Sequence, residues 1–302
     1  MIDYLKAVLV FIMLIPNSSK LSVQKDSLDN INNQSSYLGQ IPPNDTPKFF
    51  APEIVSRNDF FEHSSPVFSQ ELDEVFWSAK QSGQRYLQIY YIKLVNGKWS
   101  DPAIVSFSGN YNLDNPALSF DGKRLYFASD RPTYPGSSRK DWNIWVVTKN
   151  GDLWSQPSMI SESINSTYDE RGPSVSRDGS LYFTRIVGSN ENIYVSDWDN
   201  QRFLEPQKLD NQINPGFLDV SIGIAPDESY LLLEIPMNDI PTIYVSYKLQ
   251  KNTWSKPFTL SLGWSRFPYV SPDKKYLFFM TREGIYWRNT SIIDKLKPVQ
   301  TN

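Results

Sequence analysis

The sequence predicts an all-β fold, a single five-bladed β-propeller built from four-stranded antiparallel blades. One pattern of about fifty residues recurs five times along the chain, and such self-similarity is typical of propellers and solenoids. Each copy carries four short strand signals, as a propeller blade requires. The strand that the last copy lacks is found near the N-terminus, which favours a closed ring without unpaired strand edges.

Each copy opens with a first strand and a tight turn. The strand starts at Pro, or at Ile in the fourth copy, and an acidic residue follows five residues later. Asp at this place, followed by Gly in two copies, is typical of a hairpin turn. The first strands start at Pro66, Pro116, Pro173, Ile222 and Pro268, and the acidic residues are Glu71, Asp121, Asp178, Asp227 and Asp273.

The second strand of each copy is an unbroken apolar run, which suits a strand buried on both faces in the middle of a blade. These runs are 75–77, 125–127, 181–183, 231–233 and 277–279. The third strand carries an Ile followed by Tyr or Trp, at Ile89, Ile144, Ile193, Ile243 and Ile285. We expect each third strand to pair with the second strand before it.

The fourth strand carries a Trp/Phe-x-x-Pro motif that begins at Trp99, Trp154, Phe203 and Trp254. Proline indicates an outermost strand, where one edge needs no hydrogen-bond donor. A tryptophan at a fixed place in the repeat indicates packing between blades rather than a platform for stacking a sugar. The fifth copy has no such motif after Ile285, but Phe49-x-x-Pro52 supplies one.

We therefore expect the stretch 49–55 to pair with the fifth copy and close the ring. A six-bladed propeller with one degenerate blade is the alternative. The domain organisation that follows is a signal peptide over 1–19, a polar linker over 20–47, the propeller over 48–290, and a short C-terminal helix or tail over 291–302. Within the linker, Tyr37 and Leu38 form the one apolar spot and are expected to contact the propeller.

These repeats resemble the WD40-like β-propeller repeat family, as found in TolB-like propellers. The matching stretches run from Pro116 through Asp121-Gly122, from Leu125 to Arg131, and from Pro268 to Asp273, together with Asn143-Ile-Trp145. The resemblance covers residues 49–288 and departs from the pattern in the first and fourth copies. It implies a scaffold whose members include protein-binding periplasmic proteins and propellers attached to peptidases, so it leaves the function open.

Composition excludes several classes of function. The net charge is -3, and no basic patch is interleaved with aromatic residues, so nucleic acid is not an expected partner. The chain has no Cys, which excludes disulfides, thiolate metal sites and a Cys nucleophile. Its only histidine is His63, which excludes a His-rich metal centre. We expect no cofactor and no metal, although an oxygen-only Ca²⁺ site from Asp169, Glu170 and Asp219 is left open.

The N-terminus predicts export. Ala7 to Pro16 is an apolar block that follows Lys6, long enough for the core of a signal peptide and too short to span a bilayer. A buried N-terminal segment is the alternative. We expect the mature chain to be secreted or periplasmic, not inserted in a membrane, and monomeric.

Propeller geometry points to the mouth of the axial channel as the candidate site. The connections from fourth to first strands and from second to third strands emerge on the same face, where propellers usually bind their ligands. The longest of them, 129–142, contains Tyr134, Arg139 and Lys140. Charged residues stand just before the first strands and just after the second strands, with Lys80 and Glu234 among the latter. The predicted ligand-binding residues are His63, Asp114, Arg131, Glu170, Arg185, Asp219, Arg266 and Arg282.

Three functions fit this arrangement. The first is an exported binding module that engages a protein or an envelope glycan at the channel mouth. The second is a glycoside-processing enzyme that uses Asp114, Glu170 and Asp219 as acid and base. The third is a structural subunit of an envelope complex. Pairing of these charges with one another, such as Glu170 with Arg185, would indicate a role in the scaffold instead of in catalysis.

Overall fold

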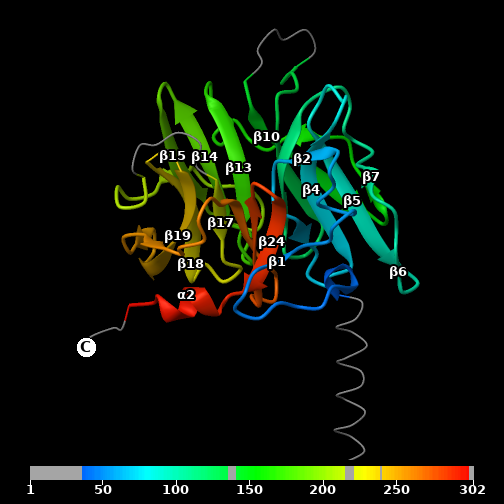
Figure 1. Ribbon diagram of the computed structural model, residues 1–302. Helices are drawn as coiled ribbons and strands as arrows, with labels where there is room; N and C mark the ends of the chain where they lie inside the picture. The colour runs from blue at the N-terminus through cyan, green and yellow to red at the C-terminus, as the bar shows by residue number, and fades with distance from the viewer. Residues whose placement is uncertain (1–35, 135–140, 215–220, 239, 299–302) are drawn as a thin grey trace, which may run out of the picture.

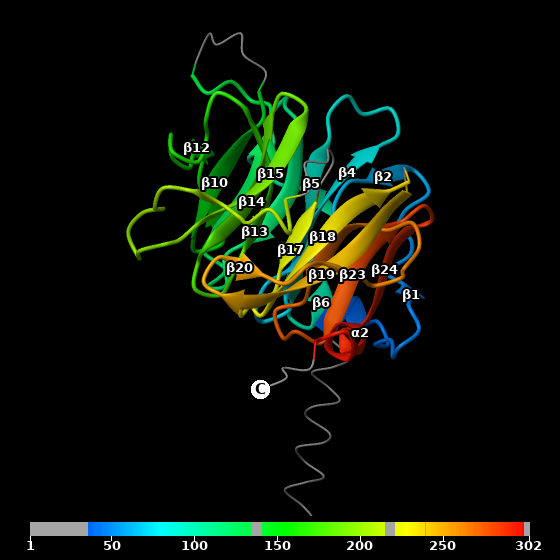
Figure 2. The ribbon, with the colours of Figure 1, turned by 90° about the vertical axis from the view of Figure 1, so that its left-hand side faces the viewer.

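The computed structural model describes residues 36–134, 141–214, 221–238 and 240–298. Within these residues, five antiparallel sheets are arranged around a common axis (Figure 1). Figure 2 shows the fourth of these blades, with β18 and β19, lying beside the fifth, with β23 and β24. The predicted five-bladed, all-β propeller is confirmed.

Each blade is one antiparallel sheet whose strands follow one another along the chain, except at the last blade. Blade 1 contains β2 (Phe60–Glu62), β3 (Val67–Phe68), β4 (Glu74–Gln81), β5 (Gln88–Val95), β6 (Lys98–Trp99) and β7 (Ala103–Ile104). Blade 2 contains β8 (Leu113–Leu118), β9 (Arg124–Ser129), β10 (Asn143–Asn150), β11 (Leu153–Trp154) and β12 (Ser158–Met159). Blade 3 contains β13 (Asp169–Val175), β14 (Leu181–Val187), β15 (Asn190–Ser196) and β16 (Gln207–Lys208). Blade 4 contains β17 (Ile222–Ile224), β18 (Tyr230–Met237), β19 (Ile240–Gln250), β20 (Thr253–Trp254) and β21 (Phe258–Thr259). Blade 5 contains β22 (Arg266–Val270), β23 (Tyr276–Thr281), β24 (Gly284–Asn289) and β1 (Lys48–Phe49).

The turns between first and second strands are held by a repeated serine–aspartate pair. The Ser119 hydroxyl donates to Asp121 at 2.6 Å, and the backbone N–H of Arg124 donates back to that hydroxyl at 2.9 Å. The same serine–aspartate bond recurs in blades 3 and 5. In blade 1 the acid that bonds to the serine is Asp73 and not Glu71. These local bonds explain why an acidic residue recurs at each turn.

The outermost strand is interrupted at the Trp/Phe-x-x-Pro motif in three blades. In blade 1, β6 pairs with the end of β5 and β7 pairs with its middle, on either side of Pro102. Blades 2 and 4 repeat this split. The motif tryptophans turn towards the preceding blade, with ring centroids 6.0 Å apart for Trp154 and Phe76 and 6.2 Å apart for Trp254 and Tyr182. The predicted packing between blades is confirmed.

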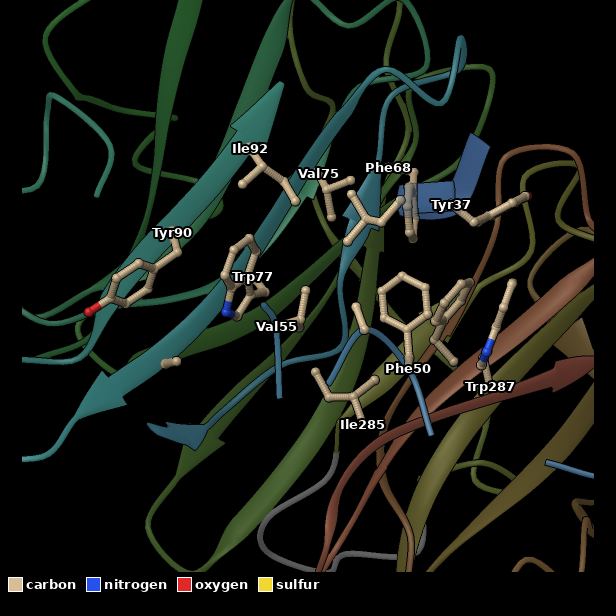
Figure 3. Close-up of a cluster of buried hydrophobic side chains, with 14 residues drawn as sticks. Tyr37, Phe50, Val55, Phe68, Val75, Trp77, Tyr90, Ile92, Ile285 and Trp287 are labelled. Carbon is tan, nitrogen blue, oxygen red and sulfur yellow. The ribbon is translucent and has the colours of Figure 1, made fainter. Parts of the chain in front are cut away.

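The ring is closed by the N-terminal segment, as the sequence predicted. In blade 5, Lys48 pairs with Trp287 and Phe49 with Tyr286. The backbone N–H of Phe50 then donates to the Ile285 carbonyl at 2.8 Å. Figure 3 shows Phe50 and Trp287 in the buried cluster that joins blade 5 to blade 1. We call this junction the seam.

Two short segments flank the seam. The 3₁₀ turn η1 (Ser36–Gly39) buries Tyr37, whose hydroxyl donates to Asp273 at 2.8 Å. The helix α2 (Ser291–Lys295) follows β24, and its Ile293 is buried. No helix in the described part of the chain has the length and apolar character needed to cross a membrane.

Candidate functional site

The five innermost strands line a narrow axial cavity of about 90 Å³. Its wall is formed mainly by short side chains and prolines, including Ser64, Ser174 and Pro268. Blades 4 and 5 approach most closely at Gly223, where an added Cβ would lie 2.4 Å from the Pro268 carbonyl oxygen. Any larger residue at this position would have to push β17 and β22 apart. The cavity is therefore too narrow for a large ligand and directs attention to its mouth.

A β-bulge at the start of three innermost strands decides which side chains reach the mouth. The register shifts between Asp114 and Ala117 in β8, and the same shift follows Arg171 in β13 and Arg266 in β22. A bulge bends the strand and re-aims its side chains. In blade 1 the equivalent level is occupied by His63, whose backbone N–H donates to the Ser78 carbonyl at 2.8 Å.

We call His63, Asp114, Arg171 and Arg266, together with Glu234 of β18, the mouth ring. His63 and Asp114 form its most direct link, because the His63 Nδ1 lies 2.7 Å from the Asp114 Oδ2. The other carboxylate oxygen accepts from the Ser78 hydroxyl and from the Asn115 N–H, each at 2.8 Å. Burial alone lowers the pKa of His63, but the Asp114 carboxylate outweighs it and the net pKa is raised. The positive charges of Arg266 and Arg171 oppose this rise.

Arg266 is paired with Glu234. The Arg266 Nε lies 2.5 Å from Glu234 Oε1, and the other carboxylate oxygen accepts from the Ser221 hydroxyl and from the Phe267 N–H. Burial raises the pKa of Glu234, although Arg266 opposes that rise. The pair therefore fixes Arg266 at the edge of the ring.

Arg171 is held more loosely. Its Nη2 lies 3.1 Å from Asp169 Oδ2, and its guanidinium lies 4.6 Å from the centroid of the Trp142 ring. The other oxygen of Asp169 accepts from the Trp142 N–H at 3.0 Å. In the described part of the chain, the Arg171 Nε has no hydrogen-bond acceptor. That Nε is buried, so a ligand at the mouth would meet the exposed end of the guanidinium, which among the described residues is hydrogen-bonded only to Asp169.

In each of the three pairs, the cation is more exposed than its carboxylate. The exposed fractions of the side chains are 34% and 7% for His63 and Asp114, and 26% and 1% for Arg266 and Glu234. For Arg171 and Asp169 they are 39% and 31%. The mouth ring thus turns its basic side chains towards solvent, and Asp114 and Glu234 lie buried behind them. Such an arrangement attracts a negatively charged group.

Glu170 and Arg185 form the ion pair that the sequence suggested, within blade 3. Arg185 Nε lies 2.7 Å from Glu170 Oε1, and the Ser166 hydroxyl and N–H also donate to this carboxylate. Glu170 is fully buried, and burial raises its pKa in spite of these bonds. The Arg185 Nη2 donates to the Ile164 carbonyl at 2.9 Å. Both side chains therefore hold the preceding connection in place and lie behind the mouth.

Arg131 occupies the corresponding place in blade 2. Its Nη2 donates to the Phe107 and Ser108 carbonyls, each at 3.3 Å, and its guanidinium lies 5.3 Å from the Phe127 and Trp145 ring centroids. Burial lowers its pKa to about 10. Arg131 thus supports the wall of blade 2, so its replacement by an acid would disturb folding as well as any ligand.

The remaining predicted residues do not join the ring. Arg282 is exposed in the connection between β23 and β24, 5.7 Å from the Trp264 ring centroid, and lies on the outer side of blade 5. Asp219, Arg139 and Lys140 lie outside the described residues. Tyr134 is 62% exposed. One ring residue, Arg171, was not predicted, because Glu170, three residues before Pro173, was chosen, although Arg171 has the spacing of Asp114 from Pro116 and of Arg266 from Pro268.

The described carboxylates of this region, Asp114, Asp169, Glu170 and Glu234, are all engaged by protein groups. Asp114 and Glu170 each accept at least three hydrogen bonds from protein groups, which is typical of acids that stabilise a fold. Asp169 and Glu170 bind different partners. Among the described residues no three His, Asp or Glu side chains are grouped as metal ligands. The geometry therefore favours binding over acid–base chemistry.

Comparison with solved structures finds other propellers. A putative TolB from Agrobacterium tumefaciens is 17% identical, with a TM-score of 0.50 over 73% of this chain and 69% of that protein. TolB from Acinetobacter baumannii is also 17% identical, with a TM-score of 0.49, and the match covers 76% of this chain but 53% of that protein. This chain thus spans about half the length of the Acinetobacter protein. A thermostable family-43 glycoside hydrolase is 10% identical, with a TM-score of 0.52 over 78% of this chain and 90% of that protein.

These likenesses are likenesses of fold, and they agree with the resemblance of the repeats to TolB-like propellers. No protein-family model matches the chain. A search of curated proteins finds no relative either. Because one fold hosts many functions, the function has to come from the mouth ring.

Proposed function

We propose that this chain is a binding module that captures an acidic segment of a partner protein at the channel mouth. The observation that carries the proposal is the orientation of the three charge pairs. Arg171 and Arg266 present their guanidinium groups to solvent beside the His63 imidazole, whose pKa is raised by Asp114, while Asp114 and Glu234 lie buried behind them. A carboxylate arriving from a partner would meet donors already held in place, which lowers the entropy lost on binding.

Exposed aromatic side chains around the ring favour a protein partner over a glycan. Among the described residues, several large apolar side chains are exposed on strand ends or connections of the mouth face; they are Phe61, Tyr111, Tyr134, Tyr168 and Ile240. Protein interfaces are enriched in tyrosine and arginine, and aromatic anchors around charged groups carry much of the binding energy. A rim of this kind around a cationic centre suits an acidic peptide that also carries apolar residues.

The binding test uses a random peptide library displayed on phage and selected against the immobilised full chain. We expect the selected peptides to be rich in Asp and Glu and to bind less tightly as salt is raised. Arg171→Gln should weaken a selected peptide roughly 10- to 100-fold, because a hydrogen bond to a charged group is lost. Arg202→Gln is the matched control, since Arg202 also pairs with a nearby aspartate but lies in the connection between third and fourth strands, at the opposite end of the blade.

Peptides without acidic residues, or equal binding by the Arg171→Gln variant, would count against the proposal. Competition by excess neutral or anionic glycan at the same site would turn the proposal from a protein to a glycan partner. Calorimetry with the purified variants measures both the affinity for the peptide and the competition by glycan.

We also propose that the chain is exported and acts as a secreted or periplasmic monomer. The support is the apolar block from Ala7 to Pro16, which follows Lys6 and precedes small polar residues. Expression with a C-terminal tag, cell fractionation and mass spectrometry of the mature chain provide the test. A cytoplasmic product that keeps Met1 would contradict export, and elution as a dimer in size-exclusion chromatography would contradict the monomer.

A further inference from the structure

A second groove, with both apolar and charged lining residues, lies on the outer side of blade 5, beside the connection that follows blade 4. Figure 2 shows these two blades side by side. Its volume is about 520 Å³, which lies within the usual range for small-molecule sites. The β21–β22 connection contributes Trp264, and β23, β24 and their connection contribute Arg282, Glu283, Tyr286 and Arg288. No residue of the mouth ring lines it. The groove is therefore separate from the site described above.

Arg288 is the most informative residue of the groove. Its exposed fraction is only 8%, yet within the described chain it forms no ion pair with a carboxylate. Its Nε donates to the Asn289 carbonyl at 3.3 Å, whereas its two Nη groups have no hydrogen-bond acceptor in the described residues. These Nη groups are not among the buried polar atoms without a partner, so they reach the surface of the groove and are open to an anion. Burial lowers the pKa of Arg288, although the Asp45 carboxylate opposes this.

The nearest acid does not fill this role. Asp45 acts on Arg288 only through its electrostatic field. Its carboxylate already accepts from Asn289, from the Ser291 hydroxyl and from Lys295, at 3.0, 2.7 and 3.0 Å. Two donor groups of Arg288 are thus left for a planar anion such as a carboxylate, which arginine binds with two parallel hydrogen bonds.

The other groove residues suit the ring and hydroxyls of a sugar. Trp264 is half-buried, and the Arg282 guanidinium lies 5.7 Å from its ring centroid. A partly exposed tryptophan offers an apolar face of the size of a pyranose ring. Glu283 is exposed at the edge of the groove and accepts from the Tyr286 hydroxyl at 2.6 Å. Its remaining lone pairs can accept hydrogen bonds from sugar hydroxyls.

From these contacts we infer that the groove binds an acidic sugar, with the uronate carboxylate on Arg288 and the ring against Trp264. A phosphate ligand suits the groove less well. A phosphate monoester carries about 1.5 to 2 negative charges, and Glu283 would repel it more strongly than a single carboxylate. The same Glu283 is favourable for a polyhydroxylated ligand. The groove thus recognises a singly charged uronate residue within an oligosaccharide.

The test is calorimetric titration of the full chain with a galacturonate trisaccharide. The methyl ester of the same trisaccharide, which has no free carboxylate, is the ligand control. We expect the free acid to bind saturably and the ester to bind at least about tenfold more weakly. Trp264→Ala and Arg288→Gln should each weaken binding of the acid roughly 10- to 100-fold. Tyr168→Ala and Arg202→Gln, an exposed aromatic residue and an exposed cation outside the groove, should leave it unchanged.

Three results would overturn the inference. These are the absence of saturable binding up to about 10 mM trisaccharide, equal binding of acid and ester, and full binding by a folded Trp264→Ala variant. Because Arg288→Gln alters a buried residue, its circular dichroism spectrum is compared with that of the wild-type chain. If that variant does not fold, the ester and Trp264→Ala decide the outcome. The mouth variant Arg171→Gln should bind the trisaccharide normally, which separates this site from the proposed peptide site.

Discussion

Closure of the ring at the seam makes a quantitative prediction for Phe50→Ala. The Phe50 side chain is fully buried, and its ring centroid lies 5.0, 5.2 and 6.0 Å from those of Phe278, Trp287 and Phe68. Removing a buried Phe side chain costs the transfer free energy of the ring and leaves a cavity. We therefore expect the free energy of unfolding to fall by about 3 to 5 kcal/mol.

The neighbouring residue provides the control. Phe49 is half-buried and touches only the Tyr286 ring among the aromatic side chains of the described residues, at 5.4 Å. We expect Phe49→Ala to cost about 1 kcal/mol. Equilibrium unfolding in urea, followed by tryptophan fluorescence and by circular dichroism, measures both variants.

The result also tests whether the seam holds the whole ring. If it does, both probes should show one cooperative transition for the wild-type chain, because opening the seam exposes the edge of β24 and the buried cluster between blades 5 and 1 together. A loss below about 1 kcal/mol for Phe50→Ala, or equal losses for the two variants, would refute the view that this contact closes the propeller.

Two further predictions concern buried polar contacts. Burial alone would lower the pKa of His63, but Asp114 raises it. The free energy of unfolding should therefore be greatest below the ordinary histidine pKa of about 6.5 and should fall as pH rises through the raised value. Asp114→Asn should remove this dependence, and NMR titration of the single histidine should show its pKa move down; an unchanged titration would contradict the assignment. The buried Asn165 side chain bonds the Ile144 N–H and carbonyl, each at 2.8 Å, so Asn165→Ala should cost about 2 to 4 kcal/mol in urea unfolding. Asn110→Ala, in an exposed connection, should cost almost nothing, and equal losses would contradict the prediction.

Much of the fold could be predicted because its signals are local. Serine and aspartate at the turns bond within a few residues, and apolar runs identify the middle strands wherever the blade lies. The place of Phe49 in the last blade followed from counting strands, since an incomplete blade would leave an unpaired edge. The asparagines that bond the third strands, such as Asn165 and Asn214, were not recognised, although both follow an Ile and stand eight residues before the first-strand positions Pro173 and Ile222.

The candidate site could be predicted only in its location. The sequence placed charged residues at the channel mouth, but it assigned Glu170 to the level that Arg171 occupies. A shift of one residue along a strand turns a side chain to the other face of the sheet. The bulge after Arg171 therefore decides that the arginine reaches the mouth, while Glu170 bonds Arg185 behind it.

By itself, then, the sequence determined the number of blades, their strand order and the segment that closes them, since each can be read from the local strand signals of the repeats and from a count of those signals. Only the tertiary structure decided which charges meet. His63 and Asp114 lie in adjacent blades, and Arg266 and Glu234 likewise come from neighbouring blades. Arg288 acquires its buried position only where blades 4 and 5 pack. Contacts between blades depend on the bulges and on the packing of whole sheets, and no single repeat encodes these.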